Sequence, residues 1–501
     1  EAQLQMHLIC LRYYFEFTDM QGEKVYYGNY EYSRECITNR DRMFDCPQNL
    51  REEEMFEVPE WAANKVVYQI FPSRFAATEP VDKELWYKAP ITPMDDLHGN
   101  LRGIIEHMDD IQNLGIDVLY MTPIFQSNSC HKYDTTDYYQ IDPSFGTTED
   151  LKELVQKAHE RGMKVVLDAV YNHTGREFFA FADILENGEK SKYRDWYFID
   201  GFPLKSEWGE IPNFKCFGYY GGMPKLNLKN PEVEKYITDV ACYWIKECDI
   251  DGWRLDVGDE ISHFFWKNFR KAVKAVKKDL LIIGEIWHYA GDFLEGDEWD
   301  TVMNYPFYLN LIDLLADEKI TVSQFVQNLG YLKGRLNKNC YPLMWNLIDS
   351  HDTARFLHLC NDNKKKQHLA AAFQLLLPGM PMIYYGDEYA MPGANDPDCR
   401  RGMYWDEEYQ DKEMYEWYKR LIQVRKSHAC IVEGELAGIV TEDEEGTIVL
   451  IRKNGEETIA MIFNCSSSAK KFNEYTQKYN LLTENTFDGN VEGFDAAVIV
   501  L

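Results

Sequence analysis

The chain has 501 residues, of which 45% are hydrophobic, and its 53 basic and 83 acidic residues give a formal net charge of −30. That length accommodates a barrel of about 250 residues together with accessory domains. The acidic balance disfavours nucleic acid and anionic membranes as partners, because both are bound through basic patches. No apolar run approaches the ~20 residues that a membrane helix needs.

The first part of the chain, residues 1–58, predicts a small β region. Residues 11–17 and 24–32 alternate apolar and polar positions, and a turn around Gly22 separates them. The stretch 39–57 is charged and is expected to be irregular.

From Pro59 the pattern changes to alternating strands and helices, which indicates a parallel sheet. The expected strand starts are Val66, Val118, Val165, Gly252, Leu281, Thr301, Leu343 and Met382. Helices are expected over 148–161, 231–248, 261–278 and 411–428. The predicted fold class is therefore α/β, with a (β/α)8 TIM barrel over residues 59–429.

Two further segments depart from the barrel pattern. Residues 174–224, after the third strand, are rich in aromatics and glycine and have little helical periodicity, so we interpret them as a small inserted domain. Such long excursions are usually functional. Residues 430–501 alternate again and predict a C-terminal antiparallel β-sandwich.

The twelve cysteines are scattered without Cys-x-x-Cys pairs. Several, including Cys242 and Cys248, lie in mixed or apolar stretches where small buried thiols are common. We therefore expect reduced thiols and a cytoplasmic location rather than a disulfide framework. No basic start followed by an apolar centre marks a secretory signal.

Three acidic residues, Asp256, Glu285 and Asp352, each lie at or just beyond the end of a short apolar run. The carboxyl ends of parallel barrel strands face one mouth, so these side chains are expected to converge there. Glycoside hydrolysis needs such a set of carboxylates, with a nucleophile and a proton donor across the sugar ring.

Together with Asp168-Ala-Val-Tyr-Asn-His173, the segments around these residues resemble the four signature segments of the α-amylase family, glycoside hydrolase family 13. A fifth segment, Met223-Pro-Lys-Leu-Asn227, resembles the mark of the neopullulanase, cyclomaltodextrinase and maltogenic amylase group. The resemblance runs from about residue 66 to the C-terminus. It implies a retaining endo-type hydrolase of α-1,4 and also α-1,6 glucosidic bonds in maltooligosaccharides, cyclodextrins and pullulan, with transglycosylation as a competing outcome.

The resemblance assigns the roles of the carboxylates. Asp256 is the expected nucleophile, and Arg254, two residues earlier on the same strand, points to the same side and is expected to keep it charged. Glu285 is the expected acid/base, which must start protonated. Asp352 is expected to stabilise the distorted sugar.

The remaining site residues are expected to bind substrate or to support the site. The substrate-binding set that the resemblance implies is Tyr133, His173, Arg254, Glu260, Trp287, His351, Asp396 and Arg400. Asp168, which holds Arg254, and Asn172 are expected to be structural. Taken singly, a histidine or tyrosine is more often a structural residue, so these assignments depend on the resemblance.

The chain also departs from the group. The loop Phe75-Ala-Ala-Thr-Glu-Pro80 and the segment His98-Gly-Asn100 offer too few hard oxygen ligands for Ca²⁺, so we expect no tightly bound calcium and no cofactor. After the nucleophile, Gly258-Asp259 replaces the usual Ala-Asn. In the group the N-terminal β-sandwich walls the cleft of the partner in a homodimer; residues 1–58 resemble only its tail end, which leaves both dimerisation and cyclodextrin preference open.

Three alternatives stay open at this point. An exo-acting α-glucosidase would need a cleft that is closed beyond the first sugar. A non-catalytic carbohydrate-binding barrel is possible in principle because fold does not fix function, but intact Asp256, Glu285 and Asp352 argue against it. A starch-surface binding module would need exposed aromatic platforms, for which the candidates are Tyr13, Tyr14, Tyr26, Tyr27 and Tyr30.

Overall fold

The structure, a computed structural model, describes residues 11–19, 21–29, 32–46, 57–205 and 211–501; Tyr30 therefore lies outside the described residues. The chain divides into two compact units, Glu1–Phe56 and Glu57–Leu501. Within the described residues no helix has the length and apolar character to cross a membrane.

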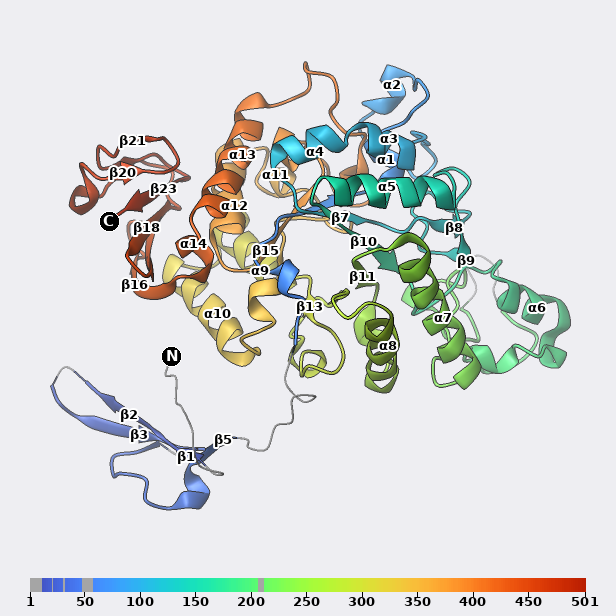
Figure 1. The fold of residues 1–501 in the computed structure, drawn as a ribbon, viewed down its shortest axis with the longest axis horizontal. Helices are drawn as coiled ribbons and strands as arrows, with labels where there is room; N and C mark the ends of the chain where they lie inside the picture. The colour runs from blue at the N-terminus through green and yellow to red at the C-terminus, as the bar shows by residue number, and fades with distance from the viewer. Residues whose placement is uncertain (1–10, 20, 30–31, 47–56, 206–210) are drawn as a thin grey trace. The chain divides into compact units, whose positions relative to one another are not determined.

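The first unit consists of short antiparallel strands (Figure 1). β1 (Leu11–Tyr13) pairs with β5 (Phe44–Cys46), and β2 (Phe15–Thr18), β3 (Lys24–Tyr27) and β4 (Tyr32–Ser33) form a second sheet. The single strand expected over 11–17 is thus two strands in different sheets. The expectation of irregular structure over 39–57 is wrong at β5, because β5 is stabilised by β1, a partner distant in sequence.

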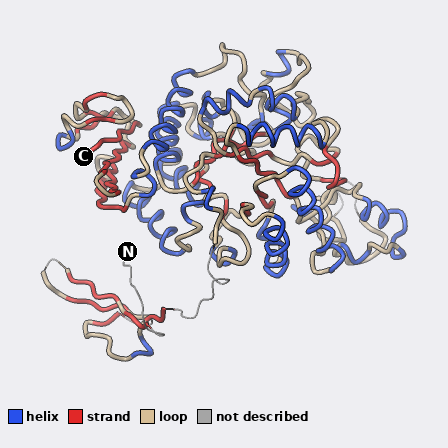
Figure 2. The backbone as a smooth tube through the Cα atoms, viewed as in Figure 1, coloured by secondary structure: helices blue, strands red, loops and turns tan. Residues whose placement is uncertain are grey.

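The second unit is built on eight parallel strands, with helices around them (Figures 1 and 2). The strands are β6 (Val67–Ile70), β7 (Val118–Met121), β10 (Lys164–Ala169), β11 (Gly252–Leu255), β12 (Leu281–Gly284), β13 (Thr301–Val302), β14 (Trp345–Asn346) and β15 (Met380–Tyr384). Their order in the sheet is β13-β12-β11-β10-β7-β6-β15-β14, and a parallel bridge between Met303 and Trp345 joins its two edges into a barrel. Each strand begins within two residues of the position expected.

The strands are continuous apolar runs because helices on the outside and side chains on the inside bury both of their faces. Val67, Tyr120, Ile283, Trp345 and Met382 from five different strands belong to one buried cluster. This packed core fixes the strand ends, so the residues that follow each strand are held on a rigid base.

Helices that follow the strands cover the barrel. They are α3 (Leu101–Glu106), α4 (Met108–Leu114), α5 (Thr148–Glu160), α7 (Pro231–Cys248), α8 (His263–Val276), α9 (Tyr305–Leu311), α10 (Val322–Arg335), α12 (Lys364–Leu376) and α13 (Lys412–Ser427). Local sequence explains their starts. Thr147 and Asp150 form a capping box at α5, and Asn230 caps α7 with Pro231 at its first position.

Shorter elements complete this unit. They are α1 (Pro72–Phe75), α2 (Lys83–Trp86), α11 (Phe356–Leu359), α14 (Cys430–Glu433) and the antiparallel pair β8 (Phe125–Ser127) and β9 (Thr135–Ile141). All ten cysteines for which side chains are described are free thiols.

The segment 174–224 contains a helix, α6 (Phe179–Asn187), although its sequence shows little helical periodicity. Phe181 of this helix packs on Tyr197 and Phe214 inside the inserted segment. Because both sides of α6 carry apolar residues, the sequence shows no polar stripe at helical spacing.

The last part of the chain forms two antiparallel sheets. The larger contains β16 (Glu435–Glu442), β17 (Thr447–Asn454), β18 (Glu457–Asn464), β23 (Asp495–Val500), β20 (Tyr479–Asn480) and β21 (Asn485–Thr486), and the smaller contains β19 (Lys470–Lys471) and β22 (Asn490–Val491). Val449, Ile462 and Phe487 belong to the buried core of this region. Phe463 of β18 stacks on Phe373 of α12, with ring centroids 4.3 Å apart, and so joins these sheets to the barrel.

Candidate active site

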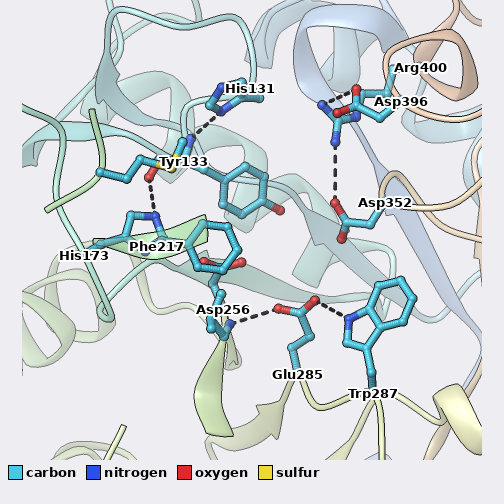
Figure 3. Close-up of a pocket in the computed structure, with 12 residues that line it drawn as sticks. His131, Tyr133, His173, Phe217, Asp256, Glu285, Trp287, Asp352, Asp396 and Arg400 are labelled. Carbon is cyan, nitrogen blue, oxygen red and sulfur yellow. Dashed lines mark hydrogen bonds and ion pairs between the residues drawn. The ribbon is translucent and has the colours of Figure 1, made fainter. Parts of the chain in front are cut away.

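A cavity of about 420 Å³ lies at the carboxyl ends of the barrel strands (Figure 3). Its lining residues are His131, Tyr133, His173, Phe217, Met223, Asp256, Val257, Glu285, Trp287, Asp352, Asp396 and Arg400. The three carboxylates singled out from the sequence are therefore brought together, although they follow three different strands. Of the substrate-binding set, Arg254 lies beneath them and Glu260 and His351 lie beside the cavity rather than in its lining.

The Arg254 guanidinium organises the carboxylates. It is fully buried at the end of β11, and its Nη1 lies 2.9 Å from Asp256 Oδ1 and 3.1 Å from Asp168 Oδ1. Its Nη2 lies 3.0 Å from Glu285 Oε2 and 3.9 Å from Asp352 Oδ2. One cation thus faces four carboxylates, and the planar fork of an arginine suits this arrangement.

Backbone and indole groups fix the position of Glu285. The Val257 N–H donates to Oε2 at 2.9 Å and the Trp287 Nε1–H donates to Oε1 at 3.1 Å. Val257 adopts a left-handed conformation with φ of +46°, which is uncommon for a β-branched residue. Such strain is concentrated at functional sites, and here it directs the Val257 N–H at Glu285.

Burial dominates the electrostatics of the cluster. It raises the pKa of Asp256 well above its usual value, with Glu285, Asp168 and Asp352 adding to the effect and Arg254 opposing it. Burial likewise raises the pKa of Asp352, and raises that of Asp168 to about 6, again against Arg254. Arg254 lowers the pKa of Asp256 against this effect of burial, which is the direction expected for it from the sequence.

A hydrogen-bond chain links the aromatic side of the cavity to this cluster. Gln69 Nε2 donates to His351 Nδ1 at 2.7 Å, which places the proton of the neutral ring on Nε2. That nitrogen contacts the Tyr133 hydroxyl, which donates to Asp168 Oδ2 at 3.0 Å. Burial lowers the pKa of His351 well below its usual value, so the ring is a neutral donor.

Arg400 connects the far end of the cavity to Asp352. Its Nε–H donates to the His351 carbonyl at 2.8 Å, and its two terminal nitrogens lie 3.4 Å from Asp352 and 2.8 Å from Asp396. Arg400 is nearly buried, whereas about half of the Asp396 side chain is exposed. Asp396 is therefore free to meet a ligand while Arg400 is held.

The segment after β10 meets the segment 223–227 beside the cavity. His173 bridges to Lys225 in antiparallel pairing, and Lys225 Nζ donates to Asn172 Oδ1 and lies 2.9 Å from Glu260 Oε2. Glu260 is therefore tied to Lys225. The His173 ring stacks on Phe217, with centroids 5.1 Å apart, and burial lowers its pKa to about 4.

The sequence matches the family described as "Alpha amylase, catalytic domain" over residues 69–434. The chain belongs to the alpha-amylase family. It is 45% identical over 452 residues to a cyclomaltodextrinase of Geobacillus thermopakistaniensis (strain MAS1), covering 89% of this chain and 76% of that one. It is 41% identical to neopullulanase 2 of Thermoactinomyces vulgaris, covering 93% of this chain and 79% of that one.

A solved cyclomaltodextrinase structure has the same fold as this alpha-amylase family member. It superposes with a TM-score of 0.92 at 37% sequence identity, covering 99% of this chain and 88% of that one. The barrel, its C-terminal sheets and the family membership expected from the sequence are therefore confirmed, and the chain is a glycoside hydrolase.

Four lining residues of this alpha-amylase barrel were not among the predicted site residues, although Met223 begins the fifth signature segment: His131, Phe217, Met223 and Val257. Phe217 and Met223 come from the inserted segment and reach the cavity only because that segment folds back on β10. His131 lies two residues before Tyr133, and its proximity to the signature aromatic was the one available signal. Val257 contributes its backbone, which side-chain patterns do not reveal.

Asn100, in one of the two segments expected to lack calcium ligands, is engaged by other groups of the protein. Asn100 Oδ1 accepts from the Gly103 N–H at the start of α3, and its Nδ2 donates to Thr78 Oγ1 at 3.1 Å. Among the described residues no group of three or more His, Cys, Asp or Glu side chains is arranged to hold a metal ion.

Proposed function

We propose that this protein is a retaining, endo-type hydrolase of α-1,4-linked glucans that acts on maltooligosaccharides and cyclodextrins and also cleaves α-1,6 bonds in pullulan. The observation that carries the proposal is the single guanidinium of Arg254 binding Asp256 and Glu285 side by side at the floor of an aromatic-lined cavity. The relatives named cyclomaltodextrinase and neopullulanase support the choice of substrates.

In the first step an Asp256 oxygen attacks the anomeric carbon while Glu285 gives its proton to the glycosidic oxygen. The carbon–oxygen bond breaks, its electron pair stays with the departing sugar, and a glycosyl ester forms on Asp256. In the second step Glu285 takes a proton from water, the water oxygen attacks the same carbon, and Asp256 leaves as a carboxylate. Interception by a sugar hydroxyl instead of water gives transglycosylation.

The contact of both carboxylates with one guanidinium supports retention. Retaining pairs lie ~5–5.5 Å apart, whereas inverting pairs need ~6.5–9.5 Å to admit a water between them. Asp256 and Glu285 each contact adjacent nitrogens of one guanidinium, at 2.9 and 3.0 Å. That shared partner favours the closer spacing.

The other lining residues would bind the sugar. A carboxylate at Asp352 would stabilise positive charge on the ring, and His173, which lines the cavity, would contact a sugar hydroxyl. His351, whose Nε2 meets the Tyr133 hydroxyl, would act through Tyr133. Tyr133 would stack on the sugar at the cleaved bond, with Asp396 and Arg400 toward the non-reducing end. Trp287, which bonds to the proton donor, would contact the leaving group.

The test is a product time course on β-cyclodextrin, pullulan and soluble starch with wild type, Asp256→Asn and Glu285→Gln. Each variant should lose activity by about 10²–10⁴-fold or more, since each removes a group that acts in the transition state. Asp109→Asn, a change of an exposed carboxylate on α4, is the control. Wild-type activity in Asp256→Asn, or β-anomeric initial products by NMR, would overturn the mechanism.

We also propose that activity needs no calcium, that the protein is cytoplasmic and that it forms a homodimer. The engagement of Asn100 as a helix cap supports the first, and the ten free thiols support the second. The homodimer follows from the family resemblance. Loss of activity in a chelator, restored by Ca²⁺, would contradict the first proposal, and light scattering of the full chain measures the third.

A further inference from the structure

The three carboxylates of the catalytic cavity are not held equally tightly. Asp256 and Glu285 lie 2.9 and 3.0 Å from nitrogens of the Arg254 guanidinium, and their side chains are 8% and 9% exposed. Asp352 lies 3.9 Å from that guanidinium and 3.4 Å from Arg400 (Figure 3), and its side chain is 27% exposed. The position of the Asp352 carboxylate therefore depends on how the loop after β14, which carries it, is held against the loop after β15, which carries Arg400.

Arg355 connects these two loops. It is fully buried at the end of the loop after β14, directly before α11. Its backbone N–H donates to the Gly393 carbonyl at 3.0 Å, and its Nε–H donates to the Cys399 carbonyl at 3.1 Å. Its Nη1 lies 2.9 Å from Asp387 Oδ1. All three partners belong to the loop after β15. Because Cys399 directly precedes Arg400, Arg355 fixes the backbone from which Arg400 projects.

A second side chain of the first loop, Asp349, supports the same contact. Its Oδ2 accepts from the Phe356 N–H at 2.7 Å, and its carboxyl group is hydrogen-bonded to that of Asp387. Asp349 Oδ1 and Asp387 Oδ2 are buried and receive no N–H among the described residues, so a proton shared between the two carboxyl groups supplies the missing donor. Burial raises the pKa of Asp349, and raises that of Asp387 well above its usual value, which favours retention of that proton. One negative charge then faces the one cation of Arg355, so the buried charges balance.

We propose that Arg355 is a positioning residue for the proposed hydrolysis, and that it sets Asp352 and Arg400 against the sugar by tying the loop after β14 to the loop after β15. Because Arg355 is fully buried, it acts only through these two residues, which line the cavity. Asp352 would stabilise the positive charge that develops on the sugar ring, so a displaced loop costs more in the transition state than in the bound substrate. The inference rests on the proposed function for its reaction, and it adds a residue outside the cavity to the groups on which the rate depends.

The experiment measures kcat and KM on β-cyclodextrin for wild type, Arg355→Lys and a matched control, Arg425→Lys. Arg425 is also a fully buried arginine, but it donates to the Leu375 and Leu377 carbonyls before β15, at the end of that strand opposite to the cavity. Both variants should unfold at a lower temperature than wild type. Below both transitions only Arg355→Lys should lower kcat, by about 10–10²-fold and by more than it changes KM. The reason is that one ammonium cannot make both side-chain contacts of the guanidinium, so the lining groups shift.

The same substitution in an Asp352→Asn background shows whether Arg355 acts through the cavity. There Arg355→Lys should lower the residual kcat by a smaller factor than in wild type, because one of its two targets is already lost. The inference is overturned by a folded Arg355→Lys with wild-type kcat, by an equal loss of kcat in Arg425→Lys, or by the same factor in both backgrounds. If Arg355→Lys does not fold, Asp387→Ala, which leaves the guanidinium without its carboxyl partner, is measured with the same readouts.

Wild-type protein that cleaves neither β-cyclodextrin nor starch would contradict the proposed function instead. The inference would then be tested by the distance between Asp352 and Arg400 in crystal structures of wild type and Arg355→Lys. An unchanged distance would overturn it, and a longer one would support it.

Discussion

The Arg254 side chain is the point at which the site is most sensitive to a single change. Its two terminal nitrogens contact Asp168, Asp256 and Glu285 within 3.1 Å, and it is fully buried. A lysine at this position would keep the positive charge, but its single ammonium could not contact Asp256 and Glu285 in the way that the two guanidinium nitrogens do.

Arg254→Lys should therefore lower kcat on β-cyclodextrin by about 10²-fold, the cost of misplacing reacting groups by about 1 Å. The variant should also unfold at lower temperature, because a buried carboxylate loses its partner. Steady-state kinetics and thermal unfolding measure the two effects. Kinetics close to wild type would show that charge alone, rather than the fork, positions the carboxylates.

His173 makes stability depend on pH. Burial lowers its pKa to about 4, from about 6.5 in an unfolded chain, so between these values the unfolded state binds more protons. Its contribution is fully present above pH 6.5 and is lost as the pH falls toward 4. Asp168, with a pKa raised to about 6, acts in the opposite direction, so only a comparison with a variant isolates His173.

His173→Gln should lose less stability than wild type on acidification from pH 6.5 to 4, by up to about 3 kcal/mol. Denaturant unfolding at a series of pH values measures the difference, and His98→Gln, at an exposed position, is the control. Parallel pH profiles for wild type and His173→Gln would contradict the assignment.

At the scale of elements, the packing of Trp299 explains the glycine after the nucleophile segment. A Cβ at Gly258 would lie 2.8 Å from the Trp299 ring, and one at Gly284, at the end of β12, would lie 2.1 Å from it. The indole therefore fills the space between the segments that carry Asp256 and Glu285. The departure from the usual alanine at position 258 follows from this contact.

Gly258→Ala should destabilise the protein by about 1–3 kcal/mol through overpacking and should lower activity by shifting the Val257 N–H away from Glu285. The double variant Gly258→Ala/Trp299→Phe should recover part of both losses, because the smaller ring leaves space for the methyl group. Thermal unfolding and kinetics of wild type, Gly258→Ala, Trp299→Phe and the double variant form a double-mutant cycle. Strictly additive losses would exclude the contact.

The sequence located the barrel strands well because their buried apolar runs, such as Leu281–Gly284, carry a local signal. It did not locate β5 or α6, since pairing with β1 and packing inside the inserted segment decide those elements. The three carboxylates were found from strand ends and resemblance. Phe217 and Met223 were missed, because their place in the cavity depends on how a long insertion folds.

For the whole second unit, the stack of Phe373 on Phe463 indicates that the C-terminal sheets stabilise the barrel rather than acting alone. Arg420 adds to this contact, since it donates to the Leu481 carbonyl and pairs with Glu484 at 2.7 Å. Phe463 is fully buried. The barrel and the C-terminal sheets should therefore unfold together.

Phe463→Ala should lower the free energy of unfolding by about 3–5 kcal/mol while leaving kcat at moderate temperature unchanged, because the cavity it creates lies far from the carboxylates in the fold. Calorimetry should show one transition at a lower temperature. Val440→Ala, at an exposed position of β16, is the control. Two separate transitions in Phe463→Ala would mean that the sheets and the barrel are independent.

The two arms of Arg254 also bear on how the site passes from one half of the reaction to the other. In the mechanism proposed above, the negative charge lies on Asp256 before attack, opposite Nη1, and on Glu285 once the ester has formed, opposite Nη2. The total charge around the guanidinium is the same in both states. The negative charge moves by a few ångströms along one rigid cation, so no buried ion has to be neutralised or exposed to solvent. The protein can thus hold its interior fixed while the reaction changes which carboxylate is ionised.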